Sequence, residues 1–146
     1  MSGFVDWRFA GSMLVLLFCS CNPSSWKMET IPLTGTISIN GNAPEGATIR
    51  LLPAEGKIDQ RGSIPAGVVG PDGSYSLTTY QFDDGVPTGT YDLTVMWLDG
   101  GPLGPDRLKN QFDGSGGNVM RVTITDDTTE LPPIELNDVK ILPERN

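Results

Sequence analysis

The segment Val86-Pro-Thr-Gly-Thr-Tyr-Asp-Leu-Thr-Val-Met-Trp-Leu98 decides the fold of this chain. Its apolar residues recur at every second position, namely Tyr91, Leu93, Val95 and Trp97. The positions between them are Thr90, Asp92, Thr94 and Met96. Successive side chains of a strand point to opposite faces, so this alternation predicts a strand over 90–98 with one face toward a core. Pro87 and Gly89 supply a turn at its start.

Six further segments carry β-branched residues or the same alternation, and no segment shows a sustained helical period. They are Leu33–Asn40, Ala47–Pro53, Ala66–Gly70, Ser74–Thr79, Asn118–Thr125 and Pro133–Asn137. Seven short strands separated by turn residues predict an all-β chain folded as a β-sandwich. The expected core residues of the earlier strands are Leu33, Ile37, Ile39, Ala47, Ile49, Leu51, Tyr75 and Leu77.

Two connections and the C-terminal tail are informative. The turn Pro71-Asp72-Gly73 predicts a hairpin between the strands over 66–70 and 74–79, because Pro fixes φ and Gly accepts a positive φ. The stretch Asp99–Asn118 holds six glycines and two prolines and predicts a long loop without a regular element. The C-terminal tail 138–146 is expected to fray.

Composition excludes several functions. The chain has 146 residues, 10 Lys+Arg against 18 Asp+Glu, and a net charge of −8. An acidic surface repels phosphate backbones, so nucleic acid is not an expected partner. The chain has no histidine, which rules out a His-containing triad and a His-ligated zinc site.

The N-terminal segment predicts an export signal. The apolar run Met13–Cys19 is too short to cross a bilayer but has the length of a secretory h-region. It leads into Ser20-Cys21, which resembles the lipobox of bacterial lipoproteins, where the cysteine thiol is acylated and becomes the new amino terminus. We therefore expect a lipoprotein-type signal peptide over 1–20, a lipid on Cys21 and a flexible tether over 21–32. The alternative is an ordinary secreted protein with two incidental cysteines or a Cys19–Cys21 pair.

Three blocks in register resemble the carboxypeptidase regulatory-like family. They are Gly35–Ile49, Gly70-Pro-Asp-Gly-Ser-Tyr-Ser-Leu77 and Val86–Val95. With the preceding lipobox, and with the segments 106–112 and 131–136, the chain looks like the small lipoproteins common in planctomycete bacteria. The resemblance covers about residues 33–136 and implies a seven-stranded transthyretin-like (prealbumin-like) Greek-key β-sandwich over 33–137. It transfers no catalytic residue, because the hydrolase known among transthyretin-like domains relies on histidines, which this chain lacks.

Within these blocks, each small or aromatic residue has an expected structural role. Gly46 and Ala47 are expected to let the second strand start close to its neighbour, and Asp72-Gly73 to close the hairpin. Tyr91 is expected to bury its ring while its hydroxyl reaches a backbone group.

The candidate ligand contacts are aromatic. Tyr80 and Phe82, beside the Asp83-Asp84 loop, are the better candidates for stacking on a sugar, with Trp26 and Trp97 as further members of a platform. Trp97 shares the inward face of Tyr91 and is more simply explained as a core residue. The pairs Asp83-Asp84 and Asp126-Asp127 offer oxygen ligands for Ca²⁺, but lack EF-hand spacing and are more simply explained as turn residues. No catalytic residue, metal ligand or cofactor is predicted, apart from the covalent lipid on Cys21.

The resulting hypothesis is a non-enzymatic lipoprotein anchored to a bacterial membrane outside the cytoplasm, which binds an unknown protein or polysaccharide through its loops. The alternative is a surface-tethered carbohydrate-binding module. Asn22 replaces the aspartate that retains some lipoproteins at the inner membrane, which favours the outer membrane.

Overall fold

The computed structural model describes Gly3 and residues 26–145. Within this part the chain is all-β and contains seven strands and no helix. The strands are β1 (Thr34–Ile39), β2 (Thr48–Pro53), β3 (Ala66–Val68), β4 (Ser74–Ser76), β5 (Gly89–Met96), β6 (Met120–Ile124) and β7 (Ile134–Leu136). Each lies within a segment that the sequence predicts, except that β5 begins one residue earlier, and several strands are two or three residues shorter than predicted.

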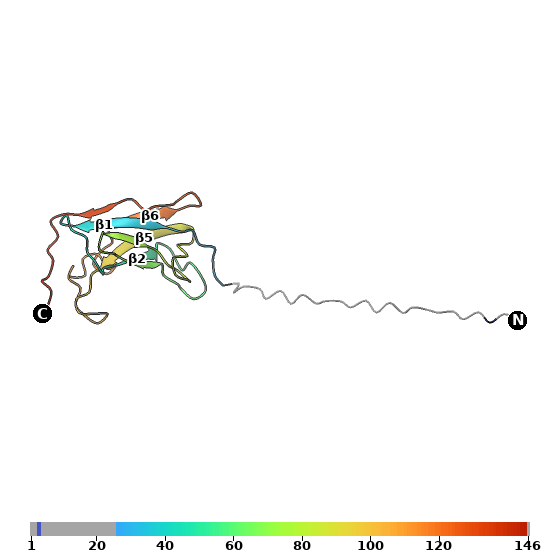
Figure 1. The fold of residues 1–146 in the computed structure, drawn as a ribbon, viewed down its shortest axis with the longest axis horizontal. Helices are drawn as coiled ribbons and strands as arrows, with labels where there is room; N and C mark the ends of the chain where they lie inside the picture. The colour runs from blue at the N-terminus through green and yellow to red at the C-terminus, as the bar shows by residue number, and fades with distance from the viewer. Residues whose placement is uncertain (1–2, 4–25, 146) are drawn as a thin grey trace.

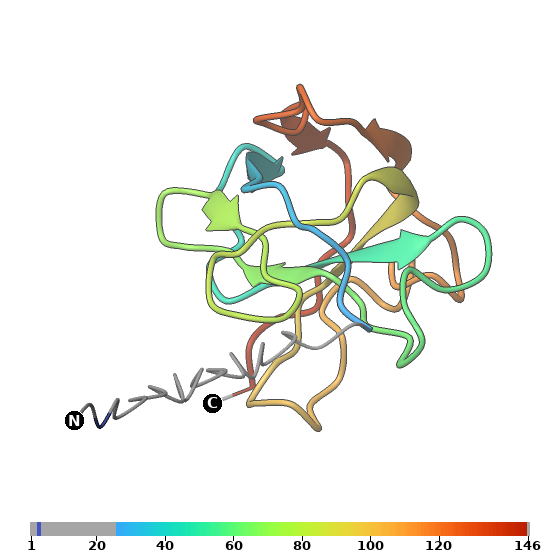
Figure 2. The ribbon, with the colours of Figure 1, turned by 90° about the vertical axis from the view of Figure 1, so that its right-hand side faces the viewer.

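The strands form two sheets that pack as a β-sandwich (Figure 1). One sheet has the order β4-β1-β7 and the other the order β3-β2-β5-β6. All pairs are antiparallel except β1 and β7, which are parallel. Figure 2 looks onto the right-hand end of Figure 1, where the connecting loops gather and where the described chain begins.

The longest pairing joins β2 to β5, from Thr48 opposite Met96 to Pro53 opposite Tyr91. The inward side chains of this pair are completely buried, as the alternation predicts: Ala47, Ile49, Leu51, Tyr91, Leu93 and Val95 are all 0% exposed. On the facing sheet, Leu33, Ile37 and Ile39 of the first strand segment are buried against them. The hydrophobic core therefore lies between the inward faces of the two sheets.

The tyrosine hydroxyl at the start of β5 has the expected backbone partner. Tyr91 Oη donates to the carbonyl oxygen of Pro87 at 2.8 Å. The ring is completely buried, and Gly89, with φ of 154°, passes beside it. The Pro-x-Gly-x-Tyr sequence thus fixes how the chain enters β5.

Two expectations about individual residues need correction. Thr94, placed on the outer face by the alternation, is 0% exposed, because the loop after β5 folds back over that face. The backbone N–H of Val95 donates to Phe112, and Gly114 lies against Thr94. Gly46 is required by its backbone conformation, φ +80°, and not by close packing, since a Cβ there would meet no atom within 4 Å.

The loop over 99–118 contains no strand or helix, as expected, but it is organised by one carboxylate. Asp106, 6% exposed, accepts hydrogen bonds from the backbone N–H groups of Trp97, Leu108 and Asn110. A buried acid that receives three backbone donors holds the loop against the sheet.

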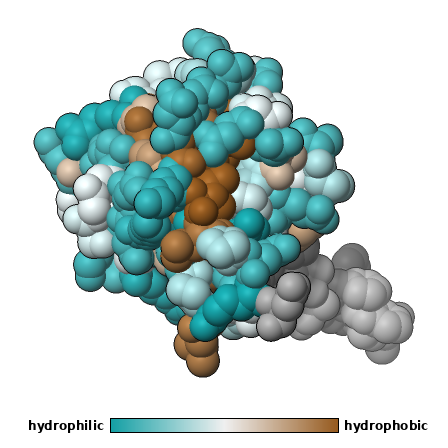
Figure 3. Space-filling model, turned by 90° about the vertical axis from the view of Figure 1, so that its left-hand side faces the viewer, coloured by the Kyte–Doolittle hydropathy of each residue, from teal (hydrophilic) through white to brown (hydrophobic). Residues whose placement is uncertain are grey.

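The C-terminal tail was expected to fray, but it lies against this loop. Leu142 exchanges hydrogen bonds with Arg107 through its N–H and its carbonyl oxygen. Arg145 donates to the carboxylate of Asp99, which is 8% exposed. Figure 3 looks onto this left-hand end of Figure 1 and shows an apolar band recessed between hydrophilic residues.

At the other end, residues 26–31, expected as part of a flexible tether, contact the sandwich: Ile31 pairs with Val86, and the Met28 N–H donates to Tyr80 Oη. The predicted signal peptide, Cys19 and Cys21 lie outside the described residues.

Candidate functional site

At the edge between β3 and β4, the structure corrects the predicted hairpin: the turn forms, but the two strands do not pair along their length. The predicted hairpin turn forms: the Gly73 N–H donates to Gly70, Gly73 has φ +84°, and Asp72 accepts from the N–H and hydroxyl of Ser74. The two strands nevertheless belong to different sheets, β3 beside β2 and β4 beside β1.

The open hairpin is held at its two ends only. Gly70 bonds to Ser74 near the turn, and Ala66 exchanges two backbone hydrogen bonds with Thr78 at the far end. Between them, Val68 stands in register with Ser76, but no pairing joins these two residues. Because each strand follows its own sheet, the middle of the hairpin forms no ladder, although the backbones of Gly67 and Ser76 lie close together.

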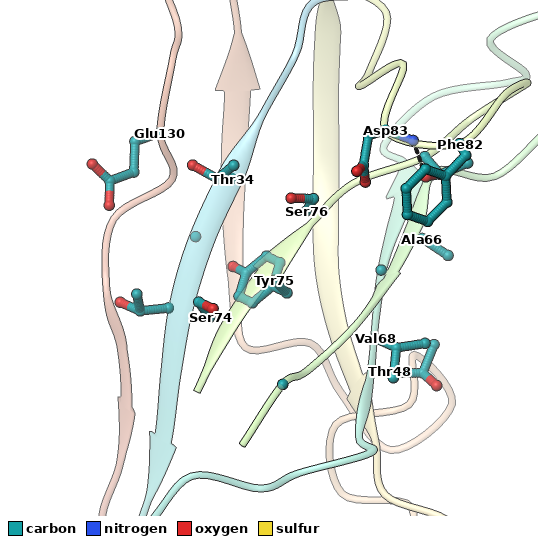
Figure 4. Close-up of a pocket in the computed structure, with 15 residues that line it drawn as sticks. Thr34, Thr48, Ala66, Val68, Ser74, Tyr75, Ser76, Phe82, Asp83 and Glu130 are labelled. Carbon is teal, nitrogen blue, oxygen red and sulfur yellow. Dashed lines mark hydrogen bonds between the residues drawn. The ribbon is translucent and has the colours of Figure 1, made fainter. Parts of the chain in front are cut away.

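A groove of about 810 Å³ lies over this open edge (Figure 4). Its rim carries the hydroxyls of Thr34, Thr36, Thr48, Ser74, Ser76 and Thr78, and its floor includes Gly35, Gly67 and Gly70. Its charged lining residues are Asp83 and Glu130. The groove therefore combines hydroxyl groups with a lining surface that is mostly apolar, which suits binding of an uncharged partner with both polar and apolar groups.

Tyr75 fills the space beneath the groove. Its ring lies over Gly35, its cross-strand partner, where a Cβ would stand 2.4 Å from the tyrosine oxygen. Among the described residues, its buried hydroxyl has no hydrogen-bond partner, and burial raises the pKa of Tyr75 to about 12. This ring is only 3% exposed and acts as a filler of the core beside a glycine.

Two large apolar side chains stand exposed along the groove. Phe82 is 91% exposed and Val68 is 65% exposed. In Figure 4 they lie on the same side of Tyr75, with Phe82 at the upper end of the groove next to Asp83. Isolated exposed apolar residues are ordinary, but two that line one groove mark a surface that can bury them in a complex.

The loop that carries Phe82 is fixed by Asp84. Its carboxylate accepts hydrogen bonds from three successive backbone N–H groups, those of Thr79, Tyr80 and Gln81. The N–H of Asp83, which has φ +55°, donates to the hydroxyl of Thr78. Asp83 and Asp84 thus act as turn residues, as expected, and the turn holds the Phe82 ring outward.

Tyr80 points to a different place from Phe82. Its ring meets Trp26 edge-on, with 5.5 Å between centroids, and its hydroxyl donates to Asp59 at 2.9 Å. Burial raises the pKa of Tyr80, and so does the neighbouring Asp59. The two favoured aromatic candidates therefore do not form one platform.

Asp59 accepts the hydrogen bond that fixes the Tyr80 hydroxyl beside Trp26. Burial opposes ionisation of its carboxyl, but hydrogen bonds from Ser63, Tyr80 and Arg61 outweigh this effect and lower its pKa to about 2. Asp59 therefore stays ionised at any ordinary pH.

The remaining candidates lie elsewhere. Trp97 is partly buried at the opposite end of β5, where its indole N–H donates to Glu45 and the Arg107 guanidinium stacks on it at 4.0 Å. Asp126 and Asp127 form an exposed turn after β6. Across residues 26–145, no group of three or more acidic or cysteine side chains is placed to hold a metal ion.

Sequence reasoning missed Val68 and the hydroxyl rim. Val68 was one of two valines in a strand expected to pair in a hairpin, and its exposure follows from the separation of β3 and β4. The signal that the sequence gives at this edge is Gly67, a glycine in mid-strand, which marks the close approach of the β4 backbone at Ser76.

Comparison with known proteins adds no assignment. No family model matches the chain, and neither does any characterised protein or solved structure with which it was compared. Within the described residues, no helix is both long and apolar enough to cross a membrane.

Proposed function

We propose that this chain is a non-enzymatic lipoprotein, anchored by Cys21 outside the cytoplasm of a bacterial cell, that binds a partner through the groove between β3 and β4. The observation that carries the binding role is the pair of exposed apolar side chains along that groove, Phe82 at 91% and Val68 at 65% exposed. A fixed turn that holds a phenylalanine in water has a cost in solvation, which a partner that covers the ring would recover.

The family proposal is a carboxypeptidase regulatory-like domain with the transthyretin-like Greek-key connection. Three features support it. The turn at Gly70–Gly73, the left-handed Gly46 and the Tyr91 hydroxyl bond each fall in one of the three blocks that resemble the family. The division of seven strands into sheets of three and four agrees with the proposal.

The anchor is tested by intact mass. The full chain is expressed in a bacterium, and the membrane fraction is analysed beside a Cys21→Ser variant. We expect a product that begins at Cys21 and carries added acyl mass, and that disappears in the variant. Fractionation of inner and outer membranes then tests the expected outer location. An unacylated product that retains both cysteines overturns the anchor.

The binding surface is tested with a matched pair of variants. Phe82→Ala removes the ring beside the groove, and Leu103→Ala removes a side chain that is 100% exposed on a different loop. We expect envelope proteins or polysaccharides that co-purify with the wild-type chain to be lost with Phe82→Ala and kept with Leu103→Ala. Equal retention by both variants contradicts the groove as the binding surface.

A carbohydrate-binding module is the second candidate. The observation that favours it is the exposed Phe82 ring beside a rim of threonine and serine hydroxyls, since sugars stack on aromatic faces and exchange hydrogen bonds with hydroxyls. A glycan array distinguishes the two candidates. Binding of a polysaccharide that Phe82→Ala abolishes supports this role, whereas Tyr80→Ala reports on the separate cluster at Trp26.

A further inference from the structure

The described chain begins in a cluster of aromatic and cationic side chains at one end of the sandwich, on the right in Figure 1. We call Trp26, Lys27, Met28, Arg61 and Tyr80 the entry cluster. The Arg61 guanidinium stacks on the Trp26 ring at 3.9 Å, and Lys27 Nζ lies 5.6 Å from the Trp26 ring and 5.5 Å from that of Tyr80. Met28 is 51% exposed.

These side chains have the chemistry of a membrane interface. Tryptophan and tyrosine place amphipathic rings at the headgroup level of a bilayer, and lysine and arginine attract anionic headgroups. The nearby carboxylate of Asp59 stays ionised and accepts hydrogen bonds from Tyr80 and from the backbone N–H groups of Arg61 and Ser63. Glu29 and Asp84 lie at the same end, so it is close to neutral, whereas the chain as a whole has a net charge of −8. Lys27 and Arg61 are its cations beside the exposed Met28.

The length of chain before Trp26 decides which end of the sandwich can meet the bilayer. Trp26 follows Cys21 by five positions, which allows a reach of at most about 18 Å. The eight residues of β5 alone extend about 26 Å along the sandwich. Cations also occur at the far end, at Arg107, Lys109 and Arg145. The segment from a lipid on Cys21 is too short for that end to face the membrane.

We infer that the entry cluster is a second, non-covalent contact with the anionic surface of the membrane that holds the lipid. This inference rests on the proposed anchor at Cys21. The contact orients the domain, because a short tether and an attractive end fix one axis while the acidic remainder is repelled from the headgroups. The far end, with the Asp99–Asn118 loop, is then directed away from the bilayer.

The test measures which tryptophan meets lipid. The full chain is purified from membranes, its acylation is verified by intact mass, and it is reconstituted into vesicles that contain brominated phosphatidylglycerol. Chains without acyl mass are coupled through Cys21, as Cys19→Ser with Trp7→Phe, to a maleimide lipid, so that the orientation is tested even if the cellular anchor fails. Trp26→Phe and Trp97→Phe form the matched pair, since one tryptophan lies in the entry cluster and the other at the opposite end of β5.

The expected result is quenching of Trp26 that exceeds quenching of Trp97 by about threefold or more, as placement of one ring at headgroup depth requires. It should fall toward the Trp97 level in pure phosphatidylcholine vesicles and at high salt. Equal quenching of both tryptophans, or quenching that is unchanged in phosphatidylcholine, overturns the inference. Absent acyl mass together with strong Trp26 quenching in the coupled chain overturns the anchor alone.

A charge-reversal pair tests the electrostatic part. Lys27→Glu with Arg61→Glu should abolish the excess quenching of Trp26. Lys109→Glu with Lys140→Glu changes the net charge equally on exposed residues away from the entry cluster and should leave it unchanged. An equal loss in both double variants would show that only net charge matters, and would overturn a contact by the entry cluster.

Discussion

At the scale of single residues, two buried tyrosines differ in whether their hydroxyl group has a hydrogen-bond partner. Both rings are buried, and burial raises the pKa of each to about 12. The hydroxyl of Tyr91 donates to Pro87, whereas that of Tyr75 has no partner among the described residues. The partner of Tyr91 was predictable from Pro-x-Gly-x-Tyr, a local pattern. The isolation of Tyr75 was not, because it depends on its cross-strand neighbour Gly35.

The same substitution should therefore have opposite effects at the two positions. Tyr91→Phe leaves a buried carbonyl without its donor and should destabilise the fold by about 1–3 kcal/mol. Tyr75→Phe removes an unsatisfied buried hydroxyl and should be neutral or stabilising by up to about 1 kcal/mol. Urea denaturation of the two variants checks this. Comparable losses at both positions would show that Tyr75 has a partner, such as a bound water.

The acid limb of the stability curve should depend on Asp59. Its pKa is about 2 in the folded protein against an ordinary value of 3.8, so the folded state binds fewer protons than the unfolded state between these values. The stabilisation is present above about pH 4 and is lost as the pH falls toward 2. Asp59→Asn should thus be less stable than wild type at pH 7, with a difference that shrinks over this window. A difference that stays constant from pH 7 to pH 2 contradicts the assignment.

At the scale of elements, the alternation of apolar residues predicted all seven strands because each has one buried face. It could not predict how β3 and β4 divide between the sheets. A turn sequence defines only four residues, and the separation of the strands is decided by long-range pairing with β1 and β2. The same limit applies to Thr94, whose burial depends on a loop that packs from about 20 residues further along the chain.

The candidate site was predictable only in part. Phe82 follows from an aromatic residue in a polar turn, and it lies at the groove. Tyr80, two residues earlier, points instead to Trp26 and Asp59. Residues two apart share a face only in a regular strand, and the turn fixed by Asp84 ends that regularity.

The open hairpin depends on Gly67, and a methyl group there should disrupt it. A Cβ at Gly67 would stand 2.3 Å from the backbone oxygen of Ser76, so one strand must move. Gly67→Ala should cost about 1–3 kcal/mol in free energy of unfolding, the usual cost of overpacking. Gly70→Ala is the control, because its Cβ would stand 3.3 Å from the Asp72 side chain. Equal costs for the two variants would place the strain elsewhere.

At the scale of the whole molecule, the described chain enters at one end of the sandwich and leaves at the other (Figure 1). It enters beside Tyr80, and its tail is held by Arg107 and Asp99 beyond the far end of β5. Among the strands of residues 26–145, only the first and the last, β1 and β7, are paired in parallel.

That parallel pair determines how the domain should respond to mechanical force. A pull between a membrane at the N-terminal end and a load at the C-terminal end draws β1 and β7 past one another lengthwise. The hydrogen bonds that join Ile37–Ile39 to Ile134–Leu136 are then loaded together in shear, whereas an antiparallel terminal pair pulled in the same way would unzip one bond at a time. Single-molecule stretching from the two termini should give a high rupture force, and stretching across β3 and β4 a lower one. A protein at a cell surface with this arrangement would withstand tension along its own axis better than tension across it.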